Sequence, residues 1–538
     1  MIFKSCLISL CMLVLACNGS DQEKTTSGGP VALAKSEQAT TTAGGQCTDP
    51  ALYGALPDDG QDDRAQVQQA IDEAHDGGTI CFRNGTYQFS RVGGTSPDRT
   101  VSLVIRGAKN IHLTGAGRQT VLEMDGDGGA GDWYLIHIYA SSDATPVKNV
   151  EITSLTLSGA KAVNTEEQTH LIGIGVAPTI SIGTVEGVSI HDVYFYHPFR
   201  KKQVGDTWVN EKGGDCIRIL GAYDPNRLTQ GQPDPVDKRS RKILISHNQF
   251  IECDRSSIGV QRGVFEVIID GNLFVDVGDQ HIDMEPTGAG GIGQFVISNN
   301  IFMGGHQGDH HVAIVGNDDL NPAEDIVFSD NVLVGRGLSL MNVRRVTVSG
   351  NFISSVAKTS EGVINAIKTI DQLIIENNNI HRLPGSITGS VVRFIHHNTG
   401  MPGRSSIRGN QIYQDGQGQI LDLQSVQNIS VSDNDLYFGG AANTYSGIRI
   451  QSTARIAKGI TVNQNRLYGP LKYGIHLVAS PNAFGSATVV GNVTEGVPTS
   501  LRCEGTGGFT KPIVHSAFNY DGATPVSCAS NSLVDHLP

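Results

Sequence analysis

The fold is decided by ILISHNQF at residues 243–250, followed one repeat later by EVIIDGNLF at residues 266–274. Each stretch alternates apolar and polar residues, places an Asn, and continues with further strand residues. Alternation with a period of two is typical of a β-strand with one buried face. The pattern recurs along the chain, with its Asn at Asn248, Asn272, Asn300, Asn331, Asn351, Asn378, Asn410, Asn434, Asn465 and Asn492.

These Asn residues are spaced by about 27 residues, and a second strand lies in each interval, as in HIDME at residues 281–285. A unit of this size cannot bury its own apolar face, whereas stacked units can. We therefore predict an all-β fold, a right-handed single-stranded parallel β-helix (solenoid), with the handedness taken from the rule for parallel crossovers. We call each full turn of this β-helix a rung. The Asn side chains are expected to form a hydrogen-bonded ladder from rung to rung and to occupy the left-handed bend of each rung.

An N-terminal capping helix is predicted over residues 63–75, because its apolar residues recur at helical spacing. Those residues are Val67, Ala70, Ile71 and Ala74. The predicted organisation is a signal peptide at 1–16, a lipid-anchored flexible tether at 17–46, the N-terminal cap with the first rungs at 47–125, the parallel β-helix at 126–495 and a C-terminal cap at 496–538.

Composition narrows the class of protein. The chain has 538 residues, of which 65 are Gly, and 39% hydrophobic residues are enough to build a core. The net charge of −13 argues against nucleic acid as a partner, which requires a basic face. The sequence has no apolar run of about 18 residues beyond its N-terminus, which argues against a polytopic membrane protein.

The N-terminus predicts export. Met1 to Ala16 reads as a signal sequence with an apolar segment after Lys4. Val14-Leu15-Ala16-Cys17 resembles a bacterial lipoprotein box, which implies cleavage before Cys17 and acylation of its thiol, with membrane association through the lipid anchor only. An ordinary signal peptide with a chance Cys is the alternative. The expected location is the outer membrane or the cell surface.

Six further cysteines fall in neighbouring pairs, as expected for disulfides in an exported protein. The pairs are Cys47 with Cys81, Cys216 with Cys253, and Cys503 with Cys528. Spacing alone does not prove the pairing, and two buried thiols at Cys216 and Cys253 are the alternative.

A family resemblance enters at the N-terminal cap. The stretch YGALPDDGQDDRAQVQQAIDEAHDGGTICFRNGTYQFS at residues 53–90, followed by LTGAGRQTVLEM at 113–124, resembles the start of pectate-lyase-superfamily β-helix proteins. The resemblance implies the fold but no single activity, because that superfamily includes lyases, hydrolases, epimerases and phage tailspikes. The Asp-Pro-His motif of mannuronan epimerases and the Gly-His-Gly motif of polygalacturonases are not found. HIDMEP at 281–286 resembles an Ile-Asp-x-Glu-Pro motif of bacterial β-helix proteins, which assigns no activity.

Function in a β-helix is expected on outward side chains of one row of strands. Strand alternation places Ile217, Ile258 and Ile282 inward. It places Arg218, Gln261, His281, Asp283, Glu285 and His311 outward on four successive rungs, with Asp215, Asp254, Arg255 and Arg262 at strand ends.

Asp283 and Glu285 are the leading catalytic candidates, with Arg218 and Arg262 to hold anionic groups. Alternate residues on a strand lie about 6.5–7 Å apart, close to the roughly 6.5–9.5 Å between the acid and base of an inverting glycosidase. Two solvated acids, or a structural Ca²⁺ site, are the alternatives. The other side chains are expected to contact substrate: Asp215, Trp208, Asp254, Arg255, Gln261, His281 and His311.

Residues 200–262 hold 12 Lys and Arg against 8 Asp and Glu, in a chain that is acidic overall. A local cationic region suggests an anionic ligand such as a uronate or sulfated glycan, while solvated loops are the alternative. The long interval before Asn248 can wall a cleft, with Trp208 as a sugar platform or as a loop anchor. His306, Asp309, His310 and His311 form a further cluster, for which an exposed loop is favoured over a transition-metal site.

The leading hypothesis is an exported enzyme that cleaves an anionic polysaccharide, similar to a glycoside hydrolase. A uronate polysaccharide lyase is the first alternative, with Ca²⁺ as a possible cofactor and no other cofactor expected. A noncatalytic glycan-binding or surface protein is the second. Clustering of acids, bases and His on four rungs favours an enzyme.

Overall fold

A computed structural model describes the chain from residue 47 to residue 536. Gaps in this description fall at residues 75, 91–99, 108, 128–132, 141–146, 164–168, 176–183, 198–201, 205–206, 210–213, 222–239, 286–290, 306–309, 319–320, 357–360, 386, 397–403, 441–443, 512, 516–518, 521–523 and 529–533. The predicted signal peptide and tether therefore lie outside the described residues. Among the described residues, no helix is long and apolar enough to cross a membrane.

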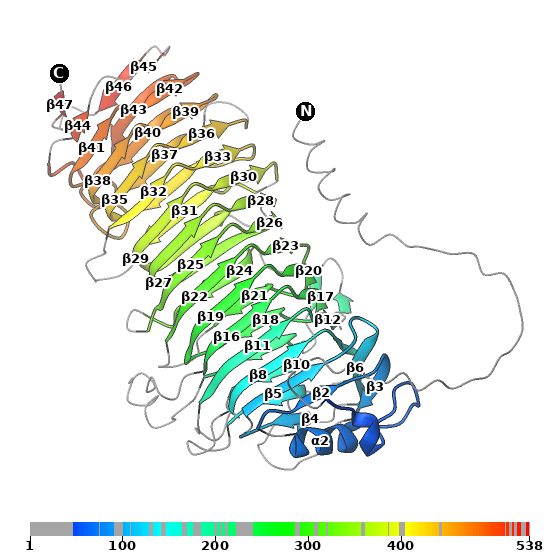
Figure 1. The fold of residues 1–538 in the computed structure, drawn as a ribbon. Coiled ribbons are helices and arrows are strands. Elements are labelled where there is room, and N and C mark those ends of the chain that lie inside the picture. Colours follow the sequence, from blue (N-terminus) through cyan, green and yellow to red (C-terminus); the bar gives the residue numbers. More distant parts are fainter. Residues whose placement is uncertain are drawn as a thin grey trace, which may run out of the picture. The chain divides into compact units, whose positions relative to one another are not determined.

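The architecture is a parallel β-helix, as predicted, and Figure 1 shows its strands stacked in chain order from the blue N-terminal end to the red C-terminal end. Three rows of strands run along it, and each strand pairs in parallel with the strand one rung away. The first row holds β4 (Thr100–Ile105), β7 (Trp133–Ile138), β10 (Thr169–Ile174), β15 (Ile217–Ile219), β18 (Ile258–Val260), β21 (Ile282–Met284), β24 (His310–Val315), β31 (Val392–His396), β34 (Leu421–Gln424), β37 (Ser446–Gln451), β40 (Tyr473–Val478), β43 (Thr499–Glu504) and β46 (Thr524–Cys528).

The second row holds β1 (Cys47–Thr48), β2 (Thr79–Cys81), β5 (Lys109–Thr114), β8 (Val147–Thr153), β11 (Val185–His191), β16 (Ser240–Ser246), β19 (Val264–Asp270), β22 (Ile292–Ser298), β25 (Ala323–Ser329), β32 (Ser405–Arg408), β35 (Gln427–Ser432), β38 (Lys458–Asn463), β41 (Ala487–Val490), β44 (Ile513–His515) and β47 (Val534–His536). Two long strands, β27 (Gly337–Ser349) and β29 (Ile364–Glu376), take part in both rows.

The third row holds β3 (Gly85–Phe89), β6 (Thr120–Asp127), β9 (Thr156–Val163), β12 (Tyr194–Tyr196), β17 (Gln249–Cys253), β20 (Leu273–Val277), β23 (Ile301–Met303), β26 (Val332–Gly335), β28 (Phe352–Val356), β30 (Asn379–Leu383), β33 (Gln411–Gln414), β36 (Asp435–Phe438), β39 (Arg466–Tyr468), β42 (Val493–Glu495) and β45 (Asn519–Tyr520). A separate antiparallel pair, β13 (Lys202–Val204) and β14 (Thr207–Val209), carries Trp208.

The predicted Asn ladder is present between the second and third rows. Nδ2 of Asn300 donates to Oδ1 of Asn331 at 3.0 Å, and the same bond links each neighbouring pair from Asn248 to Asn492. The predicted backbone position is wrong by one residue. The residue before the ladder Asn adopts the left-handed conformation, as at Asn299 and Asp330, so the Asn itself stays free to bond along the axis.

The interior is filled by columns of identical or similar apolar residues. Phe250, Phe274 and Phe302 stack face to face with ring centroids 4.7 Å apart, because parallel pairing places equivalent residues directly above one another. Branched aliphatic residues of the first and second rows complete the same core cluster. This core determines which side of every strand faces inward, and therefore which side chains face outward.

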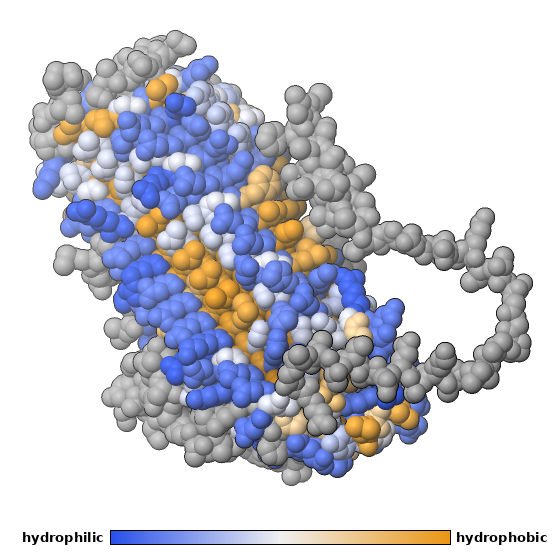
Figure 2. Space-filling view, in the orientation of Figure 1, coloured by the Kyte–Doolittle hydropathy of each residue, from blue (hydrophilic) through white to orange (hydrophobic). Residues whose placement is uncertain are grey.

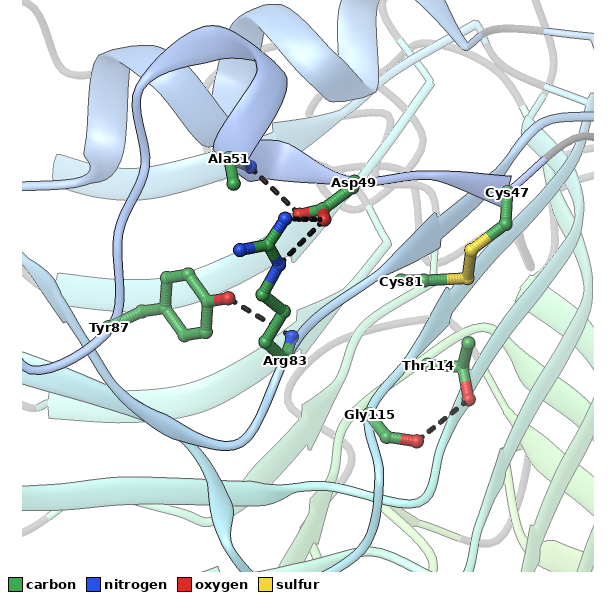
Figure 3. The surroundings of a disulfide bond; sticks show 8 residues. All are labelled: Cys47, Asp49, Ala51, Cys81, Arg83, Tyr87, Thr114 and Gly115. Carbon is green, nitrogen blue, oxygen red and sulfur yellow. Dashed lines mark hydrogen bonds and ion pairs between the residues drawn. A yellow bond between two sulfur atoms is a disulfide. The ribbon is translucent and has the colours of Figure 1, made fainter. Parts of the chain in front are cut away.

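The N-terminal rung is covered by α2 (Arg64–Glu73), close to the predicted position, with Val67, Ala70 and Ile71 buried in the core. A 3-10 helix, η1 (Pro50–Tyr53), precedes it. Figure 3 shows the Cys47–Cys81 disulfide that joins β1 to β2, and beside it the ion pair between Arg83 and Asp49. The N-terminal end is therefore closed by both a helix and a covalent link.

At the other end, strands continue the same rows as far as β47, beyond residue 495 where the sequence analysis places the start of a cap. Cys503 and Cys528 form a disulfide across two paired strands of the first row. The third predicted pair, Cys216 with Cys253, also forms a disulfide, so all three pairings are confirmed.

The outer face of the second row carries exposed aliphatic side chains on four successive rungs. They are Leu244, Ile268, Val296 and Val327, aligned by strand register. Figure 2 shows apolar surface over this part of the molecule. The first row, by contrast, carries polar and charged side chains at its outward positions, and it holds the predicted site.

Candidate functional site

One outward position of the first row can be followed from rung to rung. Strand register aligns His137 with Gly173, Gly173 with Arg218, Arg218 with Gly259, and Gly259 with Asp283. Successive strands are about 4.8 Å apart. The column therefore places Arg218 and Asp283 on the same face, two rungs apart, as the alternation predicts.

The two glycines of this column are required by their neighbours. A Cβ atom added to Gly259 would lie 2.6 Å from Oδ2 of Asp215, and one added to Gly173 would lie 2.5 Å from the Tyr134 ring. Asp215 therefore holds its carboxylate over bare backbone on the next rung. The glycines allow larger side chains to lean along the axis and come together.

Arg255 lies at the centre of the acidic part of the site. Its Nη2 donates to Oδ2 of Asp283 at 3.0 Å and to Oε2 of Glu285 at 3.2 Å. Asp215 makes the largest electrostatic contribution to stabilising the charged form of Arg255 and raises the pKa of its guanidinium. One cation is therefore shared among three carboxyl groups that come from two rungs, one on each side of the rung of Arg255.

Asp283 and Glu285 have different surroundings although they are two residues apart. Asp283 is buried, with only 4% of its side chain exposed, whereas 56% of Glu285 is exposed. Burial, the largest cause, and the charge of Glu285 together raise the pKa of Asp283 to about 7, although Arg255 acts in the opposite direction. Asp283 can therefore gain or lose a proton near neutral pH, which is what acid–base catalysis requires.

A second group of polar residues lies on the preceding rungs. The Tyr134 ring stacks between His137 and His170, with centroid separations of 4.8 and 4.7 Å. Nη1 of Arg218 lies 3.0 Å from Nε2 of His170, and the backbone N–H of Asp215 donates to Nδ1 of the same ring. Tyr134 is buried but lies outside the core cluster, because it stands on the outward side of β7.

The sequence analysis missed Tyr134, His137 and His170. Part of the signal was available, since IHI at residues 136–138 places His137 between two inward residues, in the same phase as the later strands of the first row. Following that alternation two rungs further toward the N-terminus places His137 in the column of Arg218 and Asp283. The alignment of these strands with one another could not be read from the sequence, because long loops separate them.

The Cys216–Cys253 disulfide lies directly behind the site. Cys216 follows Asp215, and Cys253 is followed by Asp254 and Arg255. Both sulfurs belong to the buried core, so the covalent link fixes the backbone from which Asp215 and Arg255 extend. The disulfide thus helps to hold a carboxylate and a cation that come from different rungs.

His281 and His311 do not face outward, and their predicted role as substrate contacts is wrong. Both are fully buried and stack on one another at 5.1 Å beside the core residue Phe302. Their Nε2 atoms bond the backbone carbonyls of Met303 and Val334. Alternation fails because His281 lies in a bend before β21 and because the register of β24 shifts between His310 and Val312.

The remaining predicted site residues are placed less centrally. Gln261 and Arg262 follow β18 and are half-buried, while Asp254 is fully buried. Trp208 lies in β14, and its side chain is outside the described part of the structure, as are His306 and Asp309. The long turns proposed as cleft walls fall mostly on residues outside the description.

The side chains present do not support the calcium hypothesis. Among the described residues, no group of three or more His, Cys, Asp or Glu side chains is arranged to hold a metal ion. Asp283 and Glu285, the proposed calcium ligands, bind the guanidinium of Arg255 instead. This pair, as arranged, does not fit a cation site, because a cationic side chain already lies between its oxygens.

Comparison with known proteins gives distant relatives. No protein-family model matches the chain. It is 27% identical over 263 residues to mannuronan C5-epimerase AlgE2 and 28% identical over 252 residues to AlgE6, both from Azotobacter vinelandii. These alignments cover 43% of this chain, and 25% and 27% of the two relatives, so the matched segment spans about a quarter of their length.

The chain is also similar to solved structures. The N-terminal fragment of bacteriophage Phi29 gene product 12 matches with a TM-score of 0.50 and 14% identity, over 89% of this chain and 71% of that chain. The A-module of Azotobacter vinelandii mannuronan C5-epimerase AlgE4 matches with a TM-score of 0.37 and 16% identity, over 85% and 98% of the two chains. The chain is thus a parallel β-helix with distant sequence similarity to mannuronan C5-epimerases.

Proposed function

We propose that the chain is an enzyme that acts on an anionic, uronate-containing polysaccharide and transfers the proton on carbon 5, next to the uronate carboxylate. The observation that carries the proposal is the position of Arg255 among Asp215, Asp283 and Glu285. A cation surrounded by carboxyl groups, one of which titrates near pH 7, suits a reaction in which a carboxylate must be neutralised before its neighbouring carbon loses a proton.

The geometry favours this reaction over the inverting hydrolase whose carboxylate spacing the sequence analysis used. Oδ2 of Asp283 and Oε2 of Glu285 lie 3.0 and 3.2 Å from one nitrogen of Arg255, so these two oxygens are at most about 6.2 Å apart. An inverting hydrolase separates its acid and base by roughly 6.5–9.5 Å to leave room for water. Here a guanidinium occupies the space between them.

Each charged group has a role in the proposed reaction. Arg255 and Arg218 bind the uronate carboxylate and offset its charge, which makes the adjacent C–H bond more acidic. Asp283, neutral below its pKa of about 7, donates a hydrogen bond to the carboxylate as negative charge develops on it. Asp215, held over Gly259, accepts the proton from carbon 5.

The fate of the resulting anion decides the product. Delivery of a proton from solvent water to the opposite face inverts carbon 5 and leaves the chain intact. Loss of the oxygen substituent at carbon 4, which takes up a proton as it leaves, instead breaks the chain and leaves an unsaturated sugar. The distant relatives are named as mannuronan C5-epimerases, which favours inversion. β-Elimination is the second candidate, because its first step uses the same groups.

The decisive experiment follows product formation in D₂O, using mannuronan and a panel of other polyuronates. Epimerisation predicts deuterium at carbon 5, seen by NMR, with unchanged chain length by size-exclusion chromatography. An ultraviolet-absorbing end group would establish elimination, and shortening without that group would establish hydrolysis and overturn the proposal. Inactivity on every anionic glycan would also overturn it.

The proposed assignment is then checked by substitution. Asp283→Asn should lower the rate by about 10²–10⁴, the usual contribution of an acid–base group. The matched control is Glu266→Gln on the exposed face of the second row, which removes an acid from a neighbouring part of the surface. If Asp283→Asn retains full activity, this face is not the reaction centre.

A further inference from the structure

The first row carries a second polar cluster near its C-terminal end. The outward column continues from Asp283 through Ala313, Ser339 and Asn365 to Arg393. Beyond Arg393 the column aligns Asp422, Arg449, His476 and Arg502 on successive rungs. The two clusters therefore lie on one continuous row of strands.

The cations of this cluster recur on every second rung, at Arg393, Arg449 and Arg502. Two rungs correspond to about 9.6 Å at a strand spacing of about 4.8 Å. That separation is comparable with the length of a disaccharide in an extended polysaccharide. A regular polyanion whose alternate sugars present a carboxylate to the same side would meet one cation per repeat.

The acids of the cluster orient the cations without covering them. Arg449 donates from Nε and Nη2 to both oxygens of Asp422, at 2.9 and 2.8 Å. Arg502 donates to Oε2 of Glu504 at 2.9 Å. Arg449 and Arg502 remain 29% and 33% exposed, and Arg393 has no ion pair in the described part of the chain.

An aromatic side chain adds a feature typical of carbohydrate sites. Tyr473 is half-buried on β40, and its ring centroid lies 4.7 Å from that of His476. Nζ of Lys472 lies 5.0 Å from the ring centroid and Cζ of Arg502 lies 6.0 Å from it. Cations and an aromatic ring together suit an anionic sugar, which offers both carboxylates and C–H faces.

The same residue pattern occurs in the first cluster. YGIH at residues 473–476 and YLIH at residues 134–137 occupy equivalent positions on β40 and β7, since both His residues belong to the same outward column. In each case the Tyr and His rings are adjacent, at 4.8 and 4.7 Å. The two ends of the row thus repeat one local arrangement, which favours a shared kind of ligand.

We propose that Arg393, Arg449, Lys472, Tyr473, His476 and Arg502 form a second binding site for anionic polysaccharide, in line with the candidate active site. His476 lies seven rungs beyond Asp283, or about 34 Å, so only a long chain can occupy both sites. The inference rests on the proposed function and deepens it. It predicts an enzyme that holds long polymers more tightly than short ones.

The test compares two triple variants of the full chain, each lacking three cations. Arg393→Gln/Lys472→Gln/Arg502→Gln removes cations of the proposed site. Arg408→Gln/Lys458→Gln/Arg466→Gln is the matched control, since its three exposed cations lie in the same region on the second and third rows. Binding of long mannuronan and of a mannuronan tetramer is measured by titration calorimetry, with the melting temperature as a check on folding.

The site triple should bind long mannuronan at least about tenfold more weakly than wild type and bind the tetramer equally well. Its long-chain affinity should also depend less on salt concentration, because fewer charges take part. Equal long-chain affinity of the two triples would overturn the inference while leaving the proposed function intact. Failure of wild type to bind or convert any anionic glycan would overturn both.

Discussion

Nη2 of Arg255 lies 3.0 Å from Oδ2 of Asp283, and the two residues come from neighbouring rungs of the first row. The contact requires both rungs, because each residue supplies only one of the two partners. The backbone before Arg255 is fixed by the Cys216–Cys253 disulfide, and Asp283 is held between Ile282 and Met284, which are both buried in the core. The charged centre therefore depends on the alignment of successive rungs.

The first prediction concerns the pH dependence of activity. Asp283 is proposed to act in its neutral form, so kcat/KM should fall as the pH rises through about 7. Glu285→Gln removes a negative charge that raises the pKa of Asp283, so the falling limb should move toward lower pH. The measurement is a kcat/KM profile between pH 5 and pH 9. Glu266→Gln should leave the profile unchanged, and an unmoved limb in Glu285→Gln would contradict the assignment.

The second prediction concerns stability. Because the folded-state pKa of Asp283 is raised from the ordinary value of 3.8 to about 7, the folded protein binds this proton more tightly than the unfolded chain. Stability from this group is present below pH 4 and is lost as the pH rises toward 7. Asp283→Asn does not titrate, so its melting temperature relative to wild type should increase between pH 4 and pH 7. Thermal unfolding across that range checks the sign, and a constant difference would refute it.

The third prediction separates a positioning His from a structural one. His170→Phe keeps a ring against Tyr134 but removes the nitrogen that faces Arg218 and the nitrogen that accepts from the backbone N–H of Asp215, so kcat/KM should fall about tenfold, mainly through KM, and the melting temperature should fall as well. His281→Phe is the matched control in the core. It loses bonds to Met303 and Ser257, so it should melt at lower temperature while the folded enzyme keeps its kcat/KM. The opposite pattern would reverse the two roles.

The fourth prediction tests the Asn ladder in mid-row. Asn331→Leu leaves the backbone N–H and the side-chain amide of Asn300 without their acceptor, and Ile297 loses a donor. Each buried group left unpaired costs about 1–3 kcal/mol, so the variant should be destabilised by at least that amount in urea unfolding. Thr347→Leu, a half-buried position on the outer face of β27, should change the free energy of unfolding by less than about 0.5 kcal/mol.

The fifth prediction concerns the N-terminus, which lies outside the described residues. Cys17 is proposed to be the lipidated first residue of the mature protein, on the strength of the Val14–Cys17 sequence and the segment of Ser, Thr, Gly, Ala and Lys without periodicity after it. Metabolic labelling with a palmitate analogue should tag wild type and Cys11→Ser, but not Cys17→Ser. A Cys17→Ser variant that stays labelled and in the membrane fraction would disprove acylation at this residue.

The sequence by itself determined the repeat, and the repeat determined the fold. Period-two alternation fixes which residues of a strand face inward, and the spacing of Asn residues fixes the length of each rung. Those two patterns were sufficient for the parallel β-helix and the ladder from Asn248 to Asn492. The three disulfide pairs were suggested separately, by the order of the cysteines along the chain. They also placed Arg218 and Asp283 on one face.

Only the tertiary structure decided which outward residues meet. Alternation breaks at bends and at shifts of register, which is why His281 and His311 turn into the core although simple parity places them outside. Long loops hide the alignment of distant strands, which is why Tyr134 and His170 were not connected with Arg218. The partners of Arg255 lie on a different rung, and contacts between rungs depend on stacking, which no pattern within a single strand encodes.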